Sequence, residues 1–264
     1  MLFYQLSGKV ESKKALIFIH GFAVNGSMFQ ELIEKIKDID RCFIIPDLRG
    51  CGKSKNITGS FTIQECVSDI KEILDQFQYE EVVLLGYSQG GTVAQQFCKQ
   101  YAHMISGLIL CNTFSHNAIT FREKLEAQIM KWVINIFSLR VVASLIVNEL
   151  SKNPDFPNTK IDKFRTMVTD NNKMALKKYM DEIRKFDSRL WLSEIKSQTL
   201  IIRGHNDKAV PEHHTYILSE GIKESKICII DNTGHDMIWT HTEKLAEVIM
   251  QFFAELKLNT NPEI

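Results

Sequence analysis

Ser88 lies in a short glycine-rich segment, residues 86–91, which reads Gly-Tyr-Ser-Gln-Gly-Gly and follows the apolar run Val-Val-Leu-Leu of residues 82–85. A G-x-S-x-G pattern between a strand and a helix holds its serine on a very tight turn, where side chains larger than glycine would collide. Residues 92–101 have a helical pattern, and a helix N-terminus offers unpaired N–H groups and a positive dipole to an anion. An ordinary glycine-rich turn would not need this strand and helix around it. The sequence therefore predicts that Ser88 is a nucleophile on a strand-to-helix turn.

Apolar runs of strand length alternate with helical patterns over the first part of the chain. The apolar runs are at residues 15–19, 42–45, 82–85 and 107–111. The helical stretches between them are at residues 27–36, 62–77 and 92–101. Nearly continuous apolar residues are typical of strands buried on both faces. This alternation predicts an α/β fold with a mostly parallel central sheet flanked by helices.

The alternation stops between residues 116 and 190, where only helical patterns occur. These patterns are at residues 120–137, 139–150, 159–168 and 173–186. Strand patterns return at residues 199–202 and 226–230, and an amphipathic helix follows at residues 242–256. We therefore predict a core domain made of residues 1–115 and 191–264, and an inserted helical cap made of residues 116–190.

The composition limits the classes of function. The 264-residue chain is long enough to bury a large core, and its formal net charge of zero does not favour nucleic acid or an anionic membrane as a partner. The N-terminal residues lack the pattern of a signal peptide, and no stretch is long and apolar enough to span a bilayer. Six scattered cysteines without a C-x-x-C pair predict free thiols in a cytoplasmic protein. The oligomeric state does not follow from the sequence.

Two polar residues after the late strands are expected partners of Ser88. Asp207 lies five residues after the apolar run that ends at residue 202, and His235 lies five residues after the run that ends at residue 230. A serine hydroxyl needs a base to take its proton and a third group to orient that base. Because parallel strands end at the same edge of a sheet, Ser88, Asp207 and His235 are expected to converge there.

Five motifs distributed over the whole chain resemble those of the α/β-hydrolase family. They are His-Gly-Phe at residues 20–22, Pro-Asp-Leu-Arg-Gly-Cys-Gly-Lys-Ser at 46–54, the Ser88 turn at 86–91, Gly-His-Asn-Asp at 204–207 and Gly-His at 234–235. The order serine, acid, histidine along the chain is also that of this family.

The resemblance implies a role for each of these residues. Ser88 would be the nucleophile, His235 the general base and later the general acid, and Asp207 the group that orients His235 and stabilises its cation. The backbone N–H groups of Phe22 and Gln89 would form the oxyanion hole. No cofactor and no metal would be needed.

A second carboxylate could be mistaken for the catalytic acid. Asp231 lies four residues before His235, at the end of the strand rather than beyond it. Some hydrolases of this fold carry their acid after the strand that precedes the cap, but here that place holds Asn112 and Thr113. Both observations favour Asp207.

The other histidines have less specific patterns. His20 is expected to brace the oxyanion loop by hydrogen bonding, and His205 to be structural or partly exposed. His213, His214 and His241 could suggest a metal, but their spacing from cysteines and carboxylates does not predict a zinc site.

The segment Gly-Lys-Ser at residues 52–54 resembles the end of a phosphate-binding P-loop. The first glycine of that motif would fall at Asp47, whose carboxylate would repel a phosphate. We therefore expect Asp47 and Arg49 to brace a loop instead.

The predicted cap would cover the strand ends, form most of the substrate pocket and exclude water. Its apolar and aromatic residues suit a hydrophobic acyl chain or an aromatic group. We predict a pocket that includes Phe22, Tyr87, Trp132, Phe137 and Trp239. Alternatively, Trp132, Phe137 and Trp191 fasten the cap to the sheet, and Trp239 packs beneath the pocket.

Three functions are compatible with these observations. The first is hydrolysis of a small to medium carboxylic ester through an acyl-enzyme. The second is carbon–carbon bond hydrolysis, lactone opening, amide cleavage or perhydrolysis by the same triad. For the carbon–carbon reaction, a basic cap residue such as Arg122, Lys131 or Arg140 would bind a substrate carboxylate. The third is a receptor of this fold with slow turnover. Ser88 argues against a dehalogenase or an epoxide hydrolase, which use aspartate as the nucleophile.

Overall fold

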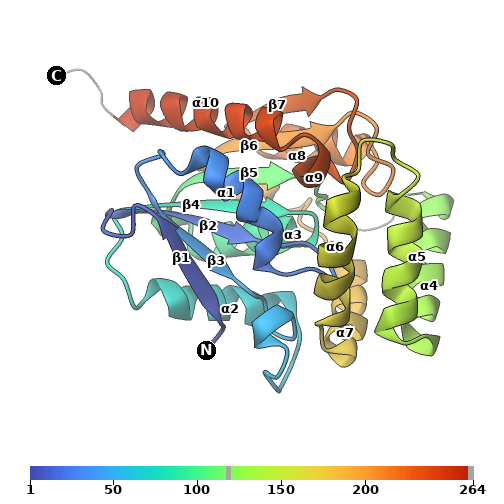
Figure 1. Cartoon of the computed structure of the whole chain (residues 1–264). Coiled ribbons are helices and arrows are strands. Elements are labelled where there is room, and N and C mark those ends of the chain that lie inside the picture. The colour runs from blue at the N-terminus through green and yellow to red at the C-terminus, as the bar shows by residue number, and fades with distance from the viewer. Residues whose placement is uncertain (117–119, 261–264) are drawn as a thin grey trace.

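The structure is a computed structural model that describes residues 1–116 and 120–260 (Figure 1). Its strands form one sheet in the order β1-β3-β2-β4-β5-β6-β7, in which β1 is antiparallel to β3 and every other neighbouring pair is parallel. The strands are β1 (Tyr4–Gly8), β2 (Lys14–Ile19), β3 (Cys42–Pro46), β4 (Glu81–Tyr87), β5 (Ile105–Cys111), β6 (Gln198–Gly204) and β7 (Ser225–Ile230). The expected α/β fold with a mostly parallel sheet is confirmed.

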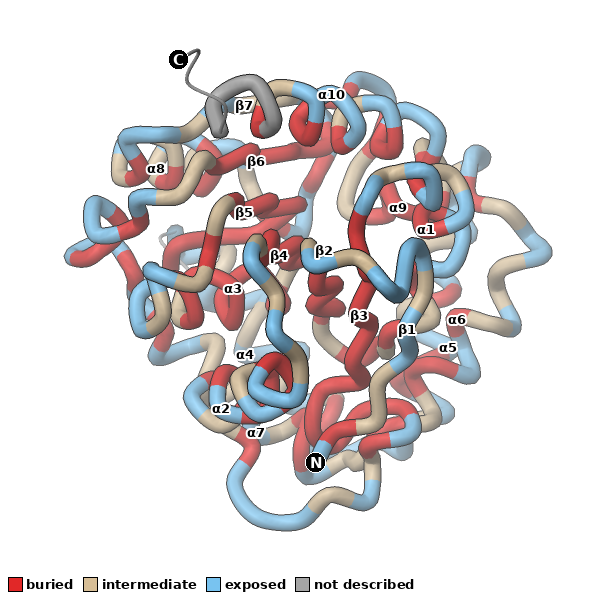
Figure 2. Tube along the Cα trace, turned by 90° about the vertical axis from the view of Figure 1, so that its left-hand side faces the viewer, coloured by how far each residue is buried: buried red, intermediate tan, exposed pale blue. Residues whose placement is uncertain are grey.

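The strands in the middle of the sheet are buried on both faces. In β2, Leu16 and Phe18 belong to the apolar cluster on one face, whereas Ile17 and Ile19 belong to the cluster on the other face. Successive side chains of a strand point to opposite faces, so both sets must be apolar. Figure 2 shows these strands as buried segments inside the molecule. The burial explains the continuous apolar runs of the sequence.

The edge strand β1 has no such run and is therefore missing from the strands expected from the sequence. Its register with β3 pairs Tyr4 with Pro46 and Gly8 with Cys42. Leu6 within it is exposed. An edge strand pairs on one side only, and here backbone pairing rather than an apolar pattern defines it.

Helices cover both faces of the sheet. The helices of the sheet domain are α1 (Gln30–Ile36), α2 (Ile63–Leu74), α3 (Gln89–Gln100), α8 (His213–Gly221), α9 (Met237–Thr240) and α10 (Thr242–Thr260). Residues of α1 and α10 pack into one apolar cluster, and residues of α2, α3 and α8 pack into the other. The sequence patterns do not predict α8, because only His214, Thr215 and Leu218 of this helix are buried. Single 3₁₀ turns are η1 (Gly26–Phe29), η2 (Gly52–Ser54), η3 (Ala102–Met104), η4 (Asn158–Lys160) and η5 (Leu192–Glu194).

Four helices between β5 and β6 form a separate group, which we call the α4–α7 segment. They are α4 (Phe121–Ile136), α5 (Leu139–Leu150), α6 (Ile161–Thr169) and α7 (Lys173–Lys185). The group lies at the end of the sheet where the parallel strands finish (Figure 1). Its two ends meet beside the sheet, because His116 forms an antiparallel bridge with Asp187, and the N–H of Ser188 donates to the carbonyl oxygen of Ser115 at 2.8 Å.

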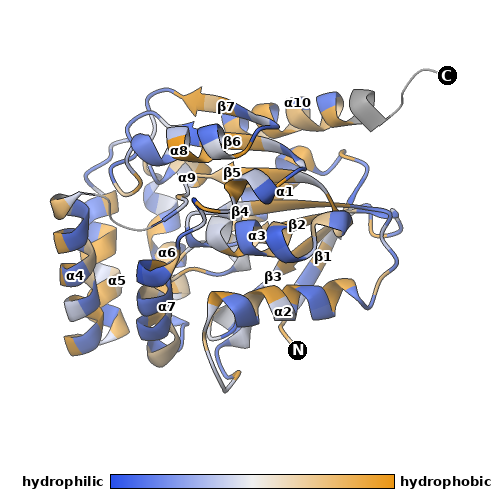
Figure 3. Ribbon diagram, turned by 180° about the vertical axis from the view of Figure 1, so that it is seen from behind, coloured by the Kyte–Doolittle hydropathy of each residue, from blue (hydrophilic) through white to orange (hydrophobic). Residues whose placement is uncertain are grey.

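Helices α4 and α5 contain hydrophobic residues along their length (Figure 3), and several of these residues are exposed. Phe121 of α4 is 82% exposed, and Leu125 and Ile129 follow it at four-residue intervals, both half exposed. Residues four apart lie on the same side of a helix, so these side chains form an apolar stripe. Among the described residues, every helix is too short or too polar to cross a membrane. All six cysteines are free thiols.

Candidate active site

Ser88 occupies the turn between β4, which ends at Tyr87, and α3, which begins at Gln89. Its backbone has φ = 53° and ψ = −120°, a conformation that non-glycine residues rarely adopt. The N–H of Ser88 donates to the carbonyl oxygen of Cys111 in β5 at 2.9 Å. The neighbouring strand thus holds the strained residue in place, which is the local geometry of a nucleophile elbow.

Helix α3 begins three residues earlier than residue 92, where the sequence pattern places its start. Gly90 therefore lies in the first helical turn, close to the end of β2. A Cβ atom at Gly90 would lie only 2.0 Å from the carbonyl oxygen of Ile19. Glycine is unfavourable in helices in general, but here only glycine allows the helix to approach the strand so closely.

The structure brings the three predicted catalytic side chains together. The Oγ of Ser88 lies 3.1 Å from Nε2 of His235, and Nδ1 of His235 lies 2.9 Å from Oδ2 of Asp207. Both distances are within the range of hydrogen bonds. Three segments that are far apart in sequence thus form one continuous hydrogen-bonded chain at the carboxyl edge of the sheet.

The carboxylate of Asp207 is fixed from two sides. Its Oδ1 accepts the N–H groups of Ala209 and Val210, both at 2.9 Å, while its Oδ2 faces His235. The side chain has no exposed surface, whereas one third of the His235 side chain is exposed. The acid is therefore inaccessible to solvent, whereas the histidine side chain is partly exposed.

Two opposing effects set the pKa of His235. Burial lowers it, but the carboxylate of Asp207 and, more weakly, that of Asp236 raise it, and the net shift is upward from 6.5. An upward shift means that the imidazolium is stabilised, as required of a base that takes a proton from serine.

The alternative acid, Asp231, takes no part in this chain. Its side chain is 82% exposed and lies 3.6 Å from Nδ1 of His205, whose own side chain is 62% exposed. The Nδ1 of His235 faces Asp207 instead. The expectation that His205 is partly exposed is confirmed.

The loop after β2 runs beside Ser88. A Cβ atom at Gly21 would lie 3.3 Å from the Cβ atom of Ser88, so the backbone that leads to Phe22 passes the nucleophile closely. His20 is fully buried; its Nδ1 lies 2.9 Å from the carbonyl oxygen of Gly21, and its Nε2 accepts the N–H of Leu48 at 2.9 Å. Burial lowers the pKa of His20, so the ring is neutral. The predicted bracing role of His20 is confirmed.

The segment that resembles a P-loop is also a braced loop. Oδ1 of Asp47 accepts the N–H of Gly26, and Oδ2 accepts the N–H of Lys53, both at 2.8 Å. Arg49 donates two hydrogen bonds of 2.7 Å to the carboxylate of Asp69. These side chains tie the loop after β3 to its neighbours, as expected from the sequence.

Asn112 connects the strand ends around the triad, a role that the sequence does not reveal. It is buried, its φ is 44°, and its Oδ1 accepts the N–H of Gly204 at 2.9 Å. Its Nδ2 donates to the Oη of Tyr87 at 3.1 Å and to the carbonyl oxygen of Gly234 at 3.0 Å. One side chain thus joins β4, the end of β6 and the loop of His235. The only sequence signal for this role is that Asn112 directly follows the apolar run of β5, at the edge of the sheet.

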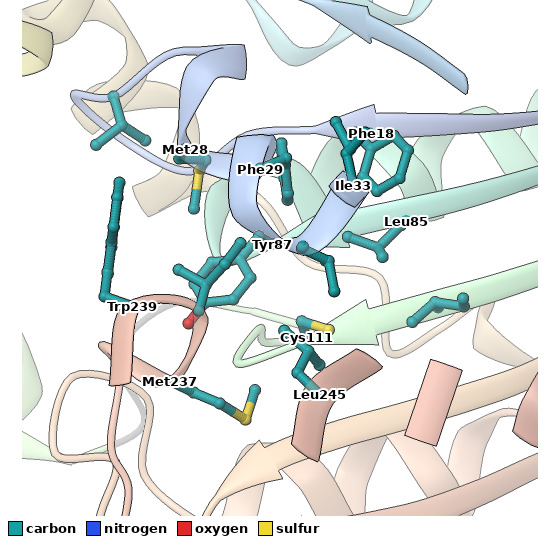
Figure 4. Packing of buried hydrophobic residues seen from close by; sticks show 14 of the residues in the cluster. Phe18, Met28, Phe29, Ile33, Leu85, Tyr87, Cys111, Met237, Trp239 and Leu245 are labelled. Carbon is teal, nitrogen blue, oxygen red and sulfur yellow. The ribbon is translucent and has the colours of Figure 1, made fainter. Parts of the chain in front are cut away.

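Two of the residues predicted to line the pocket, Tyr87 and Trp239, are buried. Tyr87 is buried beneath the histidine, its Oη donates to the carbonyl oxygen of His235 at 2.8 Å, and its ring lies among buried apolar side chains (Figure 4). Trp239 is also buried and packs against Phe156 and Phe164, with ring centroids 6.4 and 6.2 Å apart. Tyr87 is therefore hydrogen-bonded to the loop of His235, and Trp239 joins the α4–α7 segment to the sheet domain.

The remaining pocket predictions concern Phe22, Trp132 and Phe137. Phe22 is partly buried and packs against both apolar clusters. Trp132 is 55% exposed and contacts Phe137 edge-on, with ring centroids 6.1 Å apart, on the outside of the α4–α7 segment. This exposure does not fit side chains enclosed in a pocket, because an enclosed aromatic ring would be largely covered.

The basic residues considered for binding a substrate carboxylate are also placed by the structure. The Nζ of Lys131 forms an ion pair with Asp181 of α7. Arg140 is exposed at the start of α5. The side chain of Arg122 lies outside the described part of the structure.

A hollow of about 460 Å³ lies between α7 and the loop before α2. Residues such as Phe61, Met174 and Lys178 line it, and none of its lining residues belongs to the triad. We therefore do not assign the substrate to it.

Two histidines of α8 lie beside a carboxylate of α4. Nε2 of His214 is 3.1 Å from Oε1 of Glu123, and Nε2 of His213 is 3.2 Å from the same oxygen. Burial lowers the pKa of His214 to about 4. The spacing of residues along the chain did not suggest this group, because Glu123 is 90 residues away in sequence.

Comparison with known proteins places the chain in a family. A model described as alpha/beta hydrolase fold matches residues 14–242. The AB hydrolase superfamily protein YisY of Bacillus subtilis (strain 168) is 25% identical over 248 residues, which cover 90% of this chain and 91% of that protein. The 2-hydroxy-6-oxononadienedioate/2-hydroxy-6-oxononatrienedioate hydrolase of Escherichia coli (strain K12 / DH10B) is 24% identical over 271 residues, which cover 92% of this chain and 88% of that protein.

The solved structure of the esterase EaEST from Exiguobacterium antarcticum has a TM-score of 0.83 and 22% identity, and the match covers 96% of this chain and 95% of that chain. This likeness shows the fold alone. Because the family model spans most of the sequence, from β2 to the start of α10, the chain belongs to the α/β hydrolase family.

Proposed function

We propose that this protein is a serine hydrolase that cleaves carboxylic esters through an acyl-enzyme. The observation that carries the proposal is the hydrogen-bonded chain from Oγ of Ser88 through His235 to Asp207, with distances of 3.1 and 2.9 Å. This arrangement activates a serine hydroxyl as a nucleophile. The family hosts many reactions, so the proposal depends on the site and not on the fold.

The proposed reaction has two steps with the same residues. Oγ of Ser88 bonds to the acyl carbon while Nε2 of His235 takes the hydroxyl proton, and Asp207 stabilises the imidazolium. The C–O bond to the alcohol then breaks, and His235 gives its proton to the departing oxygen. A water molecule repeats the sequence on the acyl-enzyme, which releases the carboxylic acid and restores Ser88.

The oxyanion of each tetrahedral intermediate is proposed to bind the backbone N–H groups of Phe22 and Gln89. Gln89 is the first residue of α3, and the N–H groups of a first helical turn have no acceptor within the helix. Phe22 follows Gly21, whose backbone passes close to Ser88. One such donor contributes about 3–4 kcal/mol to lowering the barrier.

We also propose that residues 116–190, which contain the α4–α7 segment, act as a cap over the site. Nδ2 of Asn171 donates to the carbonyl oxygen of Ala23 at 3.0 Å, next to the oxyanion loop. Nδ2 of Asn153 donates to Oδ2 of Asp236 at 2.6 Å, next to His235. The segment thus contacts the loops on both sides of the nucleophile, where it can shape a pocket with Phe22 and exclude water.

A second reaction, carbon–carbon bond hydrolysis by the same triad, is supported by the Escherichia coli relative named as a dienedioate hydrolase. A dicarboxylate substrate would need a basic residue near the triad. Lys131 is already paired with Asp181, and Arg140 is exposed. Of the three basic side chains considered, the two that the structure describes therefore give no support to the carbon–carbon reaction.

The test is hydrolysis of p-nitrophenyl esters of increasing acyl length by the wild-type protein, with Ser88→Ala and the exposed-site control Asp231→Asn beside it. We expect turnover that Ser88→Ala abolishes and Asp231→Asn leaves unchanged, and the preferred acyl length measures the pocket. Turnover retained in Ser88→Ala would overturn the mechanism. Turnover of a vinylogous diketone acid but of no ester would establish the carbon–carbon reaction instead.

A further inference from the structure

Metal-binding side chains gather where the first turn of α4 meets the first turn of α8. Glu123 belongs to α4, and His213 and His214 begin α8. One ligand atom from each of the three residues lies within 4.8 Å of the other two. The group is separate from the triad: its members contact neither Ser88 nor His235 in any recorded hydrogen bond of the described structure.

The distances match those of ligands around one small cation. Zinc binds imidazole nitrogen and carboxylate oxygen at about 2.0–2.2 Å in a tetrahedron, which places neighbouring ligand atoms roughly 3.3–3.5 Å apart. Here the nitrogens of His214 and His213 lie 3.1 and 3.2 Å from Oε1 of Glu123. Two of the three separations between ligand atoms are therefore close to those around a tetrahedral ion, and the third is no longer than 4.8 Å.

A buried ring nitrogen without a partner provides an independent observation. Within the described residues, Nε2 of His116 is buried and makes no hydrogen bond. His116 and His214 are 5% and 3% exposed, and their rings are in contact, with centroids 5.4 Å apart. Burying a polar atom without a partner is unfavourable, and an ion that accepts nitrogen lone pairs would remove part of this cost.

Neighbouring residues hold two of these side chains in position. Oε2 of Glu123 accepts the backbone N–H and the hydroxyl of Thr120, at 2.6 and 2.8 Å, which leaves Oε1 directed at the histidines. Nδ1 of His116 is hydrogen-bonded to Oγ of Ser115 at 3.0 Å, which leaves its Nε2 as the unpaired atom. Such hydrogen bonds behind the ligands orient them in metal sites.

We propose that Glu123, His213 and His214 form a structural Zn²⁺ site, with His116 or a water molecule as the fourth ligand. Two imidazoles and one carboxylate are a donor set that zinc accepts readily. The ion fastens the start of the α4–α7 segment to α8, which follows the loop of Asp207. It takes no part in the bond cleavage proposed for Ser88.

The test uses the full chain without an affinity tag, dialysed first against a chelator and then against zinc chloride. Bound zinc is measured by inductively coupled plasma mass spectrometry. We expect about one zinc per chain in the wild-type protein and in the control His205→Gln, whose histidine is exposed at another site. Glu123→Gln and His213→Gln should each lose most of it. Zinc at saturating concentration should raise the melting temperature of the wild-type protein by at least about 5 °C.

A second measurement uses only the wild-type protein, so it tests the proposal even if the variants fail to fold. The wild-type protein loaded with Co²⁺ should show the strong visible absorption of a tetrahedral site, and zinc should displace it. The proposal is overturned if the wild-type protein binds well under half an equivalent of zinc, or if folded Glu123→Gln and His213→Gln bind zinc as the wild-type protein does.

Discussion

The carboxyl edge of the sheet and the α4–α7 segment hold their side chains in different ways. At the sheet edge, backbone groups of neighbouring strands and turns fix the polar residues: Asp207 accepts two N–H groups, and the N–H of Ser88 binds a carbonyl of β5. In the α4–α7 segment, large apolar side chains such as Phe121 and Trp132 are exposed. Side chains such as Asn153 and Asn171 make links to the sheet domain, beside a backbone hydrogen bond of 2.8 Å from Asn172 to Gly50.

The difference indicates that the sheet edge holds the catalytic residues, whereas the α4–α7 segment can vary. Backbone geometry changes little when surface residues change, so the sheet edge preserves the triad. Links through side chains are weaker individually, and the residues of the segment are free to vary without moving Ser88. Changes at the edge should therefore alter the rate of the chemical step, and changes in the segment should mainly alter stability or substrate preference.

The largest effect is expected from Ser88→Ala. Removing the nucleophile should lower kcat by about five to six orders of magnitude, because no other group here can form the acyl-enzyme. The melting temperature should stay within a few degrees of the wild-type value, since the hydroxyl makes no contact that the fold requires. Ester hydrolysis and thermal unfolding measure the two quantities; more than about one percent residual activity would contradict the assignment.

Asp207→Asn should have the next largest effect, a loss of about four orders of magnitude in kcat. The amide oxygen can still accept the N–H groups of Ala209 and Val210, so the loop should persist, but His235 loses its negative partner and its tautomer. The control is Asp231→Asn, because Asp231 is exposed. If Asp231→Asn lowers kcat more than Asp207→Asn does in the same assay, the catalytic acid has been assigned to the wrong residue.

The pH profile should report His235. The net pKa shift is upward from 6.5, so the neutral base that catalysis needs is lost as the pH falls below a value higher than 6.5. We expect kcat/KM to fall tenfold per pH unit on this acid limb. Replacing Asp236 by Asn should move the limb to lower pH, since that carboxylate also raises the pKa of His235. A constant rate down to pH 5 would be incompatible with a histidine base.

Asn112→Ala should weaken the sheet edge itself. The N–H of Gly204 would lose its acceptor and the loop of His235 one of its anchors, which should cost about 1–3 kcal/mol in the free energy of unfolding and lower kcat roughly tenfold. The matched control is Asn232→Ala, because Asn232 also has a positive φ, of 58°, but is exposed. Equal effects in urea unfolding would show that backbone conformation, not hydrogen bonding, explains the loss.

The smallest effect should come from the α4–α7 segment. Asn153→Ala removes the hydrogen bond to Asp236 and should cost about 0.5–1.5 kcal/mol in unfolding free energy while changing kcat less than about threefold. Lys152→Ala, at the neighbouring exposed position, serves as the control. A loss of kcat as large as that of Asn112→Ala would remove the distinction between the two regions.

The sequence predicts those parts of the fold that depend on strong local patterns. Apolar runs identify β2 through β7: β2 to β6 are largely buried on both faces and therefore mostly apolar, and the edge strand β7 keeps an apolar run although it is only partly buried. The pattern is silent on β1, which depends on pairing with β3, and on α8, which buries few residues. The pattern also places the start of α3 at residue 92 rather than at Gln89, because glycines normally disfavour a helix. Only the structure shows why Gly90 is needed in the first turn, where the helix approaches Ile19 closely.

The candidate site was predictable where strand ends bring residues together. Ser88, Asp207 and His235 meet because parallel strands share an edge, and their catalytic roles remain to be tested. Contacts across the α4–α7 segment were not predictable, because they depend on how helices pack. Glu123 beside His213 and His214 is one example, and the packing of Trp239 against Phe156 and Phe164 is another.

The most direct test of the central claim is reaction of the wild-type protein with a fluorophosphonate, followed by mass spectrometry of its peptides. The probe needs a serine activated by a base and no knowledge of the substrate. The account predicts one adduct per chain, on Ser88, and its loss in His235→Ala. A folded wild-type protein that remains unlabelled, or that is labelled equally in His235→Ala, would contradict the claim that the three residues act as a catalytic unit.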